Sequence, residues 1–452
     1  MENNNINGAE RKKAILVGLE ISKNDGTAYM PSKRAASDLQ AEYELQYDFR
    51  HSMEEMESLI DACDMDVAGI LTQKLPHPEA GTYLGSGKLE ELAELAAALD
   101  VQYCIFEDNL SPAQLKNIQN KVKIPVWDRT TLILEIFSIR ARTKEARLQV
   151  ESAYLQYMLP RLSGMWQHLG RQGGGGGSRA NKGVGETQLE LDRRMINHRI
   201  AELRRELEQI KGTRNVQRAG RIKGGLARVA LVGYTNAGKS TILNAMLKMQ
   251  SDDIGDKLVF EKDMLFATLD TSIRKIEMPG NRDFLLSDTV GFIENLPHGL
   301  IKAFRSTLEE ATTADLILVI LDASSSHYRQ HKKVTEDTLR GLGAEGIPRI
   351  YVMNKADLID EYTPAYPKVN DDNIWISAKD EKSIERLKEL IAERVYANSK
   401  KMRLLLPFAK GDIVNLLHSK ADVLSEEYTA DGIEITVICP EAIAGMVEGF
   451  RV

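Results

Sequence analysis

The chain has 452 residues, of which 43% are hydrophobic, and it carries a formal net charge of −7. This length suffices for about three domains, and the composition is ordinary for packed cores. Cys63, Cys104 and Cys439 lie far apart, with no spacing typical of a disulfide framework or a zinc site. No stretch approaches the roughly 18 apolar residues that span a bilayer, and the polar N-terminus lacks the apolar core of an export signal. The sequence therefore argues against a disulfide-rich secreted protein and a membrane protein, and it predicts a cytoplasmic globular one.

An α/β pattern occupies residues 13–128, after a polar N-terminus, residues 1–12, that we expect to be disordered. Short aliphatic or β-branched runs alternate in this region with helical stretches such as GKLEELAELAAAL. The runs are residues 14–19, 67–71, 103–106 and 124–127. Strands and helices in alternation predict a small parallel α/β sheet.

Two series of residues, apolar except for one serine, recur in steps of three and four between residues 129 and 212. The two series are Leu148, Ser152, Leu155, Leu159 and Leu162, and Ile196, Ile200, Leu203, Leu207 and Ile210. Each series predicts one helix of a long antiparallel hairpin. Thr187 and Glu190 form a capping box, so the second helix is expected to begin just after the glycine-rich segment. It is expected to run to about Lys211, and a linker is expected over residues 213–226.

This hairpin region differs in charge from the rest of the chain. Residues 140–223 contain 18 Lys and Arg against 8 Asp and Glu, a local net charge of +10, so the remainder carries −17. An acidic protein with one basic limb can bind nucleic acid through that limb. The alternative is a pair of solvated charged helices.

The stretch LGRQGGGGGSRANKGVGETQLELDRR, residues 169–194, falls at the predicted tip of the hairpin. A tight connection between helices needs only about 2 to 5 residues, so the long tip predicts a function. Glycines allow close approach of a partner, and the basic side chains beside them bind phosphates. The predicted contact residues are Arg171, Gly174, Gly175, Gly176, Arg179 and Lys182. A merely disordered connection is the alternative.

A phosphate-binding loop follows in ARVALVGYTNAGKSTILNAM, where G-x-x-x-x-G-K-S stands between a predicted strand and a predicted helix. Backbone N–H groups at the helix N-terminus hold phosphates, Lys239 reaches the β and γ oxygens, and Ser240 can ligate Mg²⁺. The predicted nucleotide-binding residues of this loop are Gly233, Tyr234, Thr235, Asn236, Ala237, Gly238, Lys239, Ser240 and Thr241.

Three later motifs complete a nucleotide site. The stretch FLLSDTVG supplies Asp288, predicted to hold Mg²⁺ through water, and Gly291, whose amide is predicted to meet the γ-phosphate. The remaining predicted residues are Asn354, Lys355 and Asp357 in NKAD, and Ser377, Ala378 and Lys379 in SAK. The Asp357 carboxylate can accept hydrogen bonds from N1 and the 2-amino group of guanine, so GTP is preferred to ATP. We therefore predict a P-loop GTPase domain over residues 227–398, with a generic ATPase as the alternative.

The last region, residues 402–452, follows a pattern of strand, helix and then a hairpin through Asp431 and Gly432, which predicts a small α+β module. The predicted fold class is thus α/β. It combines an N-terminal parallel α/β module with a long antiparallel helical hairpin, a P-loop GTPase domain and a small C-terminal α+β module.

The motifs together resemble the HflX family of ribosome-associated GTPases, and the resemblance covers nearly the whole chain. It runs through GYTNAGKST, LFATLD, DTVGFI, NKAD and SAK, and also through YLGSGKLEEL, LSPAQLKNI, DRTTLILEIFSIRARTKEARLQVE, LPRLSGMWQHLGRQGGG and GETQLELDRR. The resemblance implies that the hairpin belongs to a module that binds the large ribosomal subunit and its rRNA near the peptidyl transferase centre. It implies a GTPase that splits or rescues ribosomes. A GTPase for large-subunit maturation, or a GTP-sensing regulator that does not act on ribosomes, are the alternatives.

The same resemblance assigns roles to single residues. Thr268 in FATLD corresponds to the switch I threonine that joins the Mg²⁺ shell, which makes it a catalytic residue beside Lys239 and Gly291. Thr271 stands where the family usually has proline, and the glycine-rich tip lacks the family's proline. The acidic Glu426, Glu427 and Asp431 of the C-terminal module favour contact with a ribosomal protein over contact with rRNA.

Two further positions concern the chemistry of hydrolysis. Phe292 follows DTVG, where many GTPases place a water-orienting glutamine, so slow intrinsic hydrolysis is expected. Asn236 matches a position that coordinates K⁺ in potassium-stimulated relatives. A purely structural residue of the phosphate-binding loop is the alternative.

Overall fold

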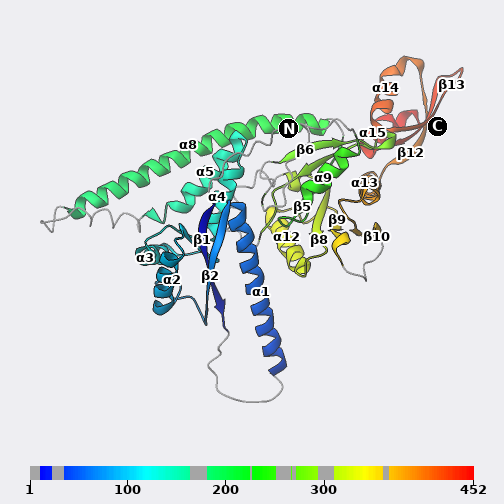
Figure 1. Ribbon diagram of the computed structural model, residues 1–452. Coiled ribbons are helices and arrows are strands. Elements are labelled where there is room, and N and C mark those ends of the chain that lie inside the picture. Colours follow the sequence, from blue (N-terminus) through cyan, green and yellow to red (C-terminus); the bar gives the residue numbers. More distant parts are fainter. Residues whose placement is uncertain are drawn as a thin grey trace, which may run out of the picture. The chain divides into compact units, whose positions relative to one another are not determined.

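The computed structural model describes residues 11–22, 35–162, 181–223, 226–250, 266, 271–293, 310–359 and 366–452 (Figure 1). The chain divides into two compact units, one reaching Leu207 and the other beginning at Glu208. Among the described residues, no helix is both long enough and apolar enough to cross a membrane.

The first unit is built on the four-stranded parallel sheet that the sequence predicted. Its order is β2-β1-β3-β4. The strands are β1 (Lys12–Ile21), β2 (Met65–Leu75), β3 (Tyr103–Phe106) and β4 (Val126–Trp127). Central β1 is buried over six consecutive residues, as a strand covered on both faces requires. Lys12, placed in the tail by the sequence, is the first residue of β1; residues 1–10 lie outside the described residues.

Helices cover both faces of this sheet (Figure 1). They are α1 (Ala35–Ala62) and α4 (Arg129–Arg140) on one face, and α2 (Ser86–Ala98) and α3 (Pro112–Val122) on the other. The Ser111 side chain caps α3 in a capping box with Gln114. Leu84, Leu92 and Ile118 pack with Ile15 and Val17 of β1 in one core cluster, which places α2 and α3 on the same face.

Two long helices, α5 (Lys144–Met158) and α8 (Asn181–Lys223), correspond to the predicted hairpin. Lys144 pairs with Glu206 at 3.2 Å, and Arg199 pairs with Glu151 at 2.8 Å. The later residue of α5 therefore meets the earlier residue of α8, which is the order of an antiparallel pair. Ile200 and Leu203 are buried on α8, as the apolar series predicted.

The predicted bounds of the second helix are wrong at both ends. It begins at Asn181, so Thr187 lies inside it and cannot serve as its N-cap, because a capping residue has non-helical backbone angles. It continues beyond Lys211 to Lys223, so residues 213–223 of the predicted linker are helical. Extending an existing helix costs little per residue, and the Arg, Gln and Ala of this stretch are good helix formers.

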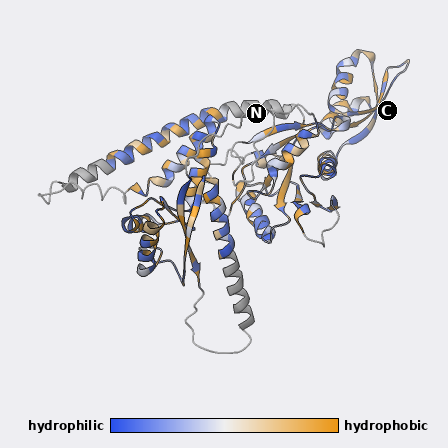
Figure 2. Ribbon diagram, viewed as in Figure 1, coloured by the Kyte–Doolittle hydropathy of each residue, from blue (hydrophilic) through white to orange (hydrophobic). Residues whose placement is uncertain are grey.

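In the second unit, a seven-stranded sheet of order β10-β11-β9-β8-β5-β7-β6 forms the centre of the predicted P-loop GTPase domain. The strands are β5 (Ala227–Gly233), β6 (Ser272–Ile276), β7 (Phe284–Asp288), β8 (Leu316–Asp322), β9 (Arg349–Asn354), β10 (Lys368–Asn370) and β11 (Asn373–Trp375). The two edge strands are antiparallel to their neighbours and the inner ones are parallel. The flanking helices are α9 (Lys239–Lys248), α12 (Tyr328–Leu342) and α13 (Glu381–Val395). The inner strands are strongly hydrophobic (Figure 2), so the carboxyl ends of β5, β8 and β9 are held rigidly by a buried core.

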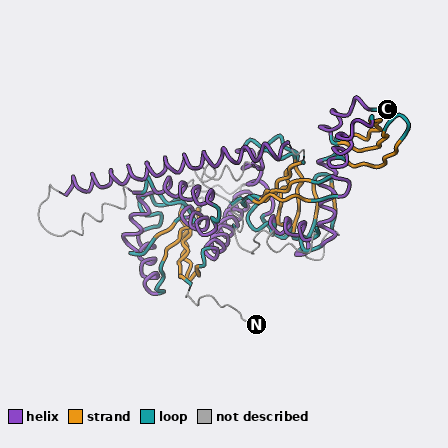
Figure 3. Tube along the Cα trace, turned by 90° about the horizontal axis from the view of Figure 1, so that it is seen from above, coloured by secondary structure: helices purple, strands orange, loops and turns teal. Residues whose placement is uncertain are grey.

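The C-terminal module is a three-stranded antiparallel sheet, β12-β14-β13, with a core of its own (Figure 3). Its elements are β12 (Lys400–Leu406), α14 (Gly411–Lys420), β13 (Asp422–Tyr428), β14 (Ile433–Cys439) and α15 (Glu441–Val447). The predicted hairpin turns at Gly432, where φ is +151° and an added Cβ would lie 2.5 Å from the Leu406 carbonyl oxygen. Helix α15 was not predicted. Asn281 of the GTPase domain donates to the carbonyls of His418 and Ala421 at the end of α14.

Candidate functional site

The phosphate-binding loop joins β5 to α9 and depends on two glycines. Gly233 has φ +149°, and an added Cβ would lie 2.2 Å from the carbonyl oxygen of Ile320. Gly238 has φ +95°, and its Cβ would lie 2.2 Å from Nδ2 of Asn354. Both positions therefore exclude a side chain on conformational and steric grounds. The loop shape that the G-x-x-x-x-G-K-S spacing requires is set by the backbone itself.

Lys239, the first residue of α9, lies 6% exposed beneath the loop. Its Nζ donates to the carbonyl oxygens of Gly233 at 3.2 Å and Tyr234 at 2.8 Å. Burial lowers the pKa of Lys239 to about 8, and the nearby Asp288 carboxylate offsets part of this effect. Phosphate oxygens arriving above the loop would supply the negative charge that favours the protonated ammonium.

Ser240 and Asp288 form the candidate Mg²⁺ site. The Ser240 hydroxyl donates to Oδ2 of Asp288 at 2.7 Å, and Asp288 is fully buried at the end of β7. A hydroxyl and a carboxylate are oxygen ligands of the kind that Mg²⁺ prefers, so this pair fits the ion. Among the described residues no group of three or more His, Cys, Asp or Glu could hold a metal.

The stretch after β7 folds back onto the phosphate-binding loop. The Phe292 amide donates to the Gly233 carbonyl at 3.0 Å, and the Phe292 carbonyl accepts from the Thr235 amide at 2.8 Å. A Cβ on Gly291 would lie 2.8 Å from Cα of Thr235 and 3.1 Å from Nζ of Lys239, so glycine is required there. The Phe292 side chain is 4% exposed and brings no polar group to the site.

A cavity of about 290 Å³ lies beside the loop and gathers the predicted base-recognition motifs. Its lining residues are Asn236, Gly238, Thr241, Asn354, Lys355, Asp357, Leu358, Ser377, Ala378 and Lys379. Asn354 ties three loops together, because its Nδ2 donates to the Ala237 carbonyl at 2.9 Å and its Oδ1 accepts from the Ala378 amide at 3.0 Å. The Asp357 side chain is 25% exposed, with Nζ of Lys379 3.9 Å away. The cavity thus presents a carboxylate where a base with two adjacent donors can reach it.

The sequence did not single out Asp322, which ends β8 beside this cavity. Its Oδ2 lies 2.8 Å from Nζ of Lys355, and its Oδ1 accepts from the Ser324 amide at 3.0 Å. Lys355 has the left-handed φ of +60°, which is costly for a residue other than glycine. An aspartate that ends a central parallel strand is a signal that could have identified it.

His331 was also not predicted. Its ring on α12 stacks on the ring of Tyr234, with centroids 3.9 Å apart and an interplanar angle of 12°. Both side chains are buried, so this stack packs α12 against the phosphate-binding loop.

Several predicted site residues lie outside the described residues. They are Thr268, Arg171, Gly174, Gly175, Gly176 and Arg179. Lys182 belongs to α8, but its side chain is likewise outside the described part of the chain.

Family models match three consecutive regions of the chain. The N-terminal region of a GTP-binding GTPase matches residues 50–138, the middle region of such a GTPase matches residues 140–221, and a 50S ribosome-binding GTPase matches residues 228–355.

Curated relatives match over most of their length. The GTPase HflX of Caldanaerobacter subterraneus subsp. tengcongensis is 42% identical over 85% of this chain and 86% of its own. The GTPase HflX of Alkalihalophilus pseudofirmus is 40% identical over 85% of this chain and 90% of its own. That of Escherichia coli K12 is 37% identical over 84% of this chain and 87% of its own.

Proposed function

Because the chain belongs to the HflX family of GTPases, which hydrolyse GTP to GDP and phosphate, we propose that it binds the large ribosomal subunit in its GTP state and splits or rescues ribosomes. Hydrolysis then allows release. The observation that carries the proposal is the combination in one chain of the Asp357 cavity with a limb, residues 140–223, of net charge +10. The first suits a guanine nucleotide and the second suits rRNA phosphates.

The nucleotide site acts mainly by holding the phosphates in place. The Lys239 ammonium, which donates to two loop carbonyls, is proposed to move to the β and γ oxygens, and the Gly291 amide is proposed to bind the γ-phosphate. Ser240, Asp288 and Thr268 would hold Mg²⁺, which when bound neutralises phosphate charge. Because Asn354 joins the phosphate-binding loop to the predicted base-recognition loops, binding of the base and binding of the phosphates are proposed to be coupled.

Hydrolysis by the isolated protein is proposed to be slow, because the buried Phe292 side chain cannot orient the attacking water. Large subunits are proposed to accelerate it by ordering the switch segments or by supplying a missing group. In this scheme the nucleotide sets affinity for the subunit through differential contacts of its two states.

Asn236, which has φ +58° and lines the cavity, is proposed to bind K⁺ beside the phosphates. Replacing K⁺ by Na⁺ should then slow GTP hydrolysis by the parent protein, and Asn236→Ala should erase the difference between the two salts. Equal rates of the parent in both salts would leave Asn236 as a structural residue of the loop.

Sedimentation of ribosomes with the protein and a non-hydrolysable GTP analogue tests the function. Loss of the intact-ribosome peak, with the protein on the large subunit, is expected. Accumulation on precursor particles would instead indicate a maturation GTPase, and no co-sedimentation would indicate a GTP-sensing regulator. The C-terminal module is proposed to contact a ribosomal protein, and cross-linking in the same samples identifies its neighbour.

A further inference from the structure

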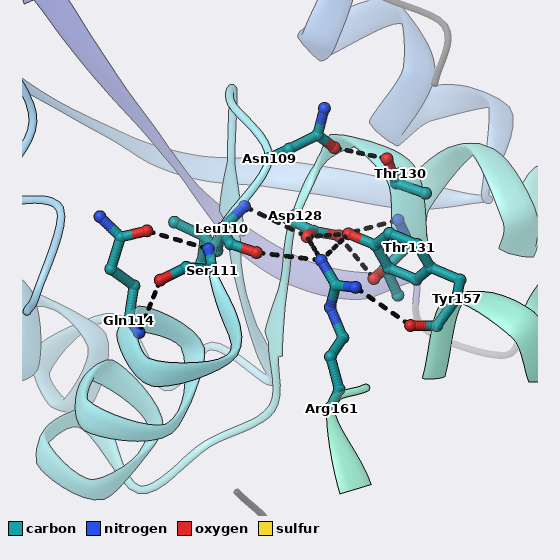
Figure 4. A network of polar contacts seen from close by, with 9 residues as sticks. All are labelled: Asn109, Leu110, Ser111, Gln114, Asp128, Thr130, Thr131, Tyr157 and Arg161. Carbon is teal, nitrogen blue, oxygen red and sulfur yellow. Dashed lines mark hydrogen bonds and ion pairs between the residues drawn. The ribbon is translucent and has the colours of Figure 1, made fainter. Parts of the chain in front are cut away.

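A closed network of polar side chains lies at the carboxyl ends of β3 and β4 (Figure 4). Its centre is Asp128, which directly follows β4 and is fully buried. The Asp128 side chain caps α4 by accepting from the amide and the hydroxyl of Thr131, at 2.9 and 2.6 Å. It also accepts from the Leu110 amide at 3.3 Å. One carboxylate thus joins the start of α4 to the loop before α3.

A third segment reaches the same carboxylate from the end of α5. The Tyr157 hydroxyl donates to Oδ2 of Asp128, and Nη2 of Arg161 lies 3.4 Å from that oxygen. Nη2 of Arg161 also donates to the Leu110 carbonyl at 2.9 Å and to the Tyr157 hydroxyl at 2.5 Å. Burial and the adjacent Asp128 charge raise the pKa of Tyr157 well above its usual range, so the phenol remains a donor.

Arg161 is held in one orientation. Its Nη1 donates to the Tyr157 carbonyl at 3.0 Å, its guanidinium carbon lies 3.5 Å from the centre of the Tyr157 ring, and its side chain is only 10% exposed. A planar guanidinium that both stacks and donates in a fork fixes direction as well as distance. A lysine could not reproduce this arrangement.

Arg161 lies just after the end of α5 in the sequence. Helix α5 ends at Met158, and Pro160 has no N–H with which to continue it. Arg161 follows directly, and the stretch of residues 169–194 that contains the five consecutive glycines begins eight residues later. The described chain therefore leaves α5 and is tied by Arg161 to two loops of the sheet, upstream of that stretch.

A buried ion pair is seldom the most stabilising choice for a protein interior. Removing two charges from water costs about as much as their attraction returns, and apolar side chains of similar size are often as stable. The best-attested role of such pairs is to select one geometry. The Asp128 network joins three chain segments through one carboxylate, so its geometric effect is to fix the end of α5 against two loops of the sheet.

We propose that Asp128 and Arg161 form an anchor that fixes the chain upstream of the glycine-rich segment, residues 169–194, and that large-subunit binding depends on this anchor. The inference rests on the proposed function, because it assigns the segment to ribosome contact. Fixing the chain next to a binding segment in advance lowers the conformational entropy that association costs. The anchor adds no phosphate contact of its own, so it should affect affinity without affecting the salt dependence of binding.

The test uses the full chain with a non-hydrolysable GTP analogue and purified large subunits, titrated at several salt concentrations. Arg161→Met keeps the stem and removes the fork, whereas Arg161→Lys keeps the charge. The matched control is Lys121→Met, which removes one positive charge from an exposed pair with Glu90. We expect Arg161→Met to raise the dissociation constant about tenfold with the salt slope unchanged, Arg161→Lys to lie between it and the parent, and the control to match the parent.

Two readouts separate positioning from general damage to the fold. If Arg161→Met only removes the anchor, the dissociation constant rises. The amount bound at saturation and the basal rate of GTP hydrolysis then stay unchanged. In the free Arg161→Met protein, amide hydrogen exchange of residues 159–162 should accelerate, while exchange in the middle of α5 should not. A lower saturating amount at an unchanged dissociation constant would indicate misfolding and overturn the anchor.

The outcomes also separate this inference from the proposed function. The combined variant Arg171→Ala, Arg179→Ala and Lys182→Ala should weaken binding and flatten its salt slope. If that variant weakens binding while Arg161→Met binds like the parent, the anchor is wrong and the ribosomal function stands. A parent protein that does not bind large subunits would overturn both.

Discussion

The proposed GTP cavity and the Asp128 network occupy corresponding places, since each lies where parallel strands end. In the GTPase domain the polar groups surround a cavity of about 290 Å³, and the Asp357 carboxylate is 25% exposed. In the N-terminal unit Asp128 is fully buried and accepts hydrogen bonds from other residues of the chain. Ligands can bind at the carboxyl edge of a parallel sheet. A ligand can bind there only where the polar groups are not all hydrogen-bonded to other residues of the chain. Changes in the first region should alter ligand choice, and changes in the second should alter geometry and stability.

The largest effect is expected on nucleotide affinity when Asp357, which lines the proposed GTP cavity, is replaced. Asp357→Asn replaces two acceptors with an amide that fits xanthine, whose 2-oxo group is an acceptor. GTP affinity should fall about 10³-fold or more, because the guanine donors lose their partner, and affinity for xanthosine triphosphate should rise. Nucleotide titrations monitor both affinities. Retained GTP affinity with no gain for xanthosine triphosphate would show that NKAD does not read the base.

In the N-terminal unit, the expected effect is on the free energy of unfolding. It arises from the buried carboxyl group of Glu107, which lies beside the Asp128 network. Burial, reinforced by the charge of Asp108, raises the pKa of Glu107 from 4.5 to about 7, and Ser52 donates to its carboxylate. The folded state therefore retains a proton that the unfolded state releases. The free energy of unfolding is therefore lowered as the pH rises. This loss of stability is absent below pH 4.5, grows between pH 4.5 and about 7, and reaches about 3 kcal/mol at higher pH.

Glu107→Gln mimics the protonated side chain and should remove this pH dependence, leaving the variant more stable than the parent at pH 8. Urea unfolding followed by the fluorescence of Trp127, with Trp166 and Trp375 replaced by phenylalanine, monitors this unit. If parent and variant lose the same stability between pH 5 and pH 8, Glu107 does not cause the pH dependence. Basal GTP hydrolysis should be the same in both proteins.

The smallest effect is expected on nucleotide affinity when Asp322 is replaced. Asp322 does not line the cavity, but it pairs with Lys355, which does. Asp322→Asn removes the charge that holds Lys355, so the dissociation constants for GDP and GTP should both rise about fivefold while kcat at saturating GTP is unchanged. In a Lys355→Met background the substitution should have no further effect. Asp315→Asn is the control, because its pair with Arg228 is more exposed. A selective fall in kcat would mean that Asp322 acts on the chemical step.

The two regions also differ in how far the sequence predicts them. The residues of the GTP cavity stand in short motifs, where spacing alone brings Gly238, Lys239 and Ser240 to one helix start. Asp322 and His331 were missed because their contacts, with Lys355 and Tyr234, join separate strands and helices.

In the N-terminal unit, the sheet followed from the alternation of strands and helices, but the Asp128 network did not. Asp128 and Arg161 are separated by 33 positions, and only packing of α5 against the sheet brings them together. The start of α8 was misplaced because Gly183 and Gly185 suggest a turn, and the cooperativity of a 43-residue helix outweighs their cost of about 1 kcal/mol each.

The most direct test of the account removes residues 171–180, which precede α8, and measures basal GTP hydrolysis and ribosome splitting in the same preparation. The GTP cavity is built by residues of another unit, so basal hydrolysis should equal that of the parent. Binding to the large subunit should weaken and splitting should be lost, because the glycines and the basic side chains beside them are gone. Full splitting by the shortened protein would show that this segment only connects two helices and would contradict the account.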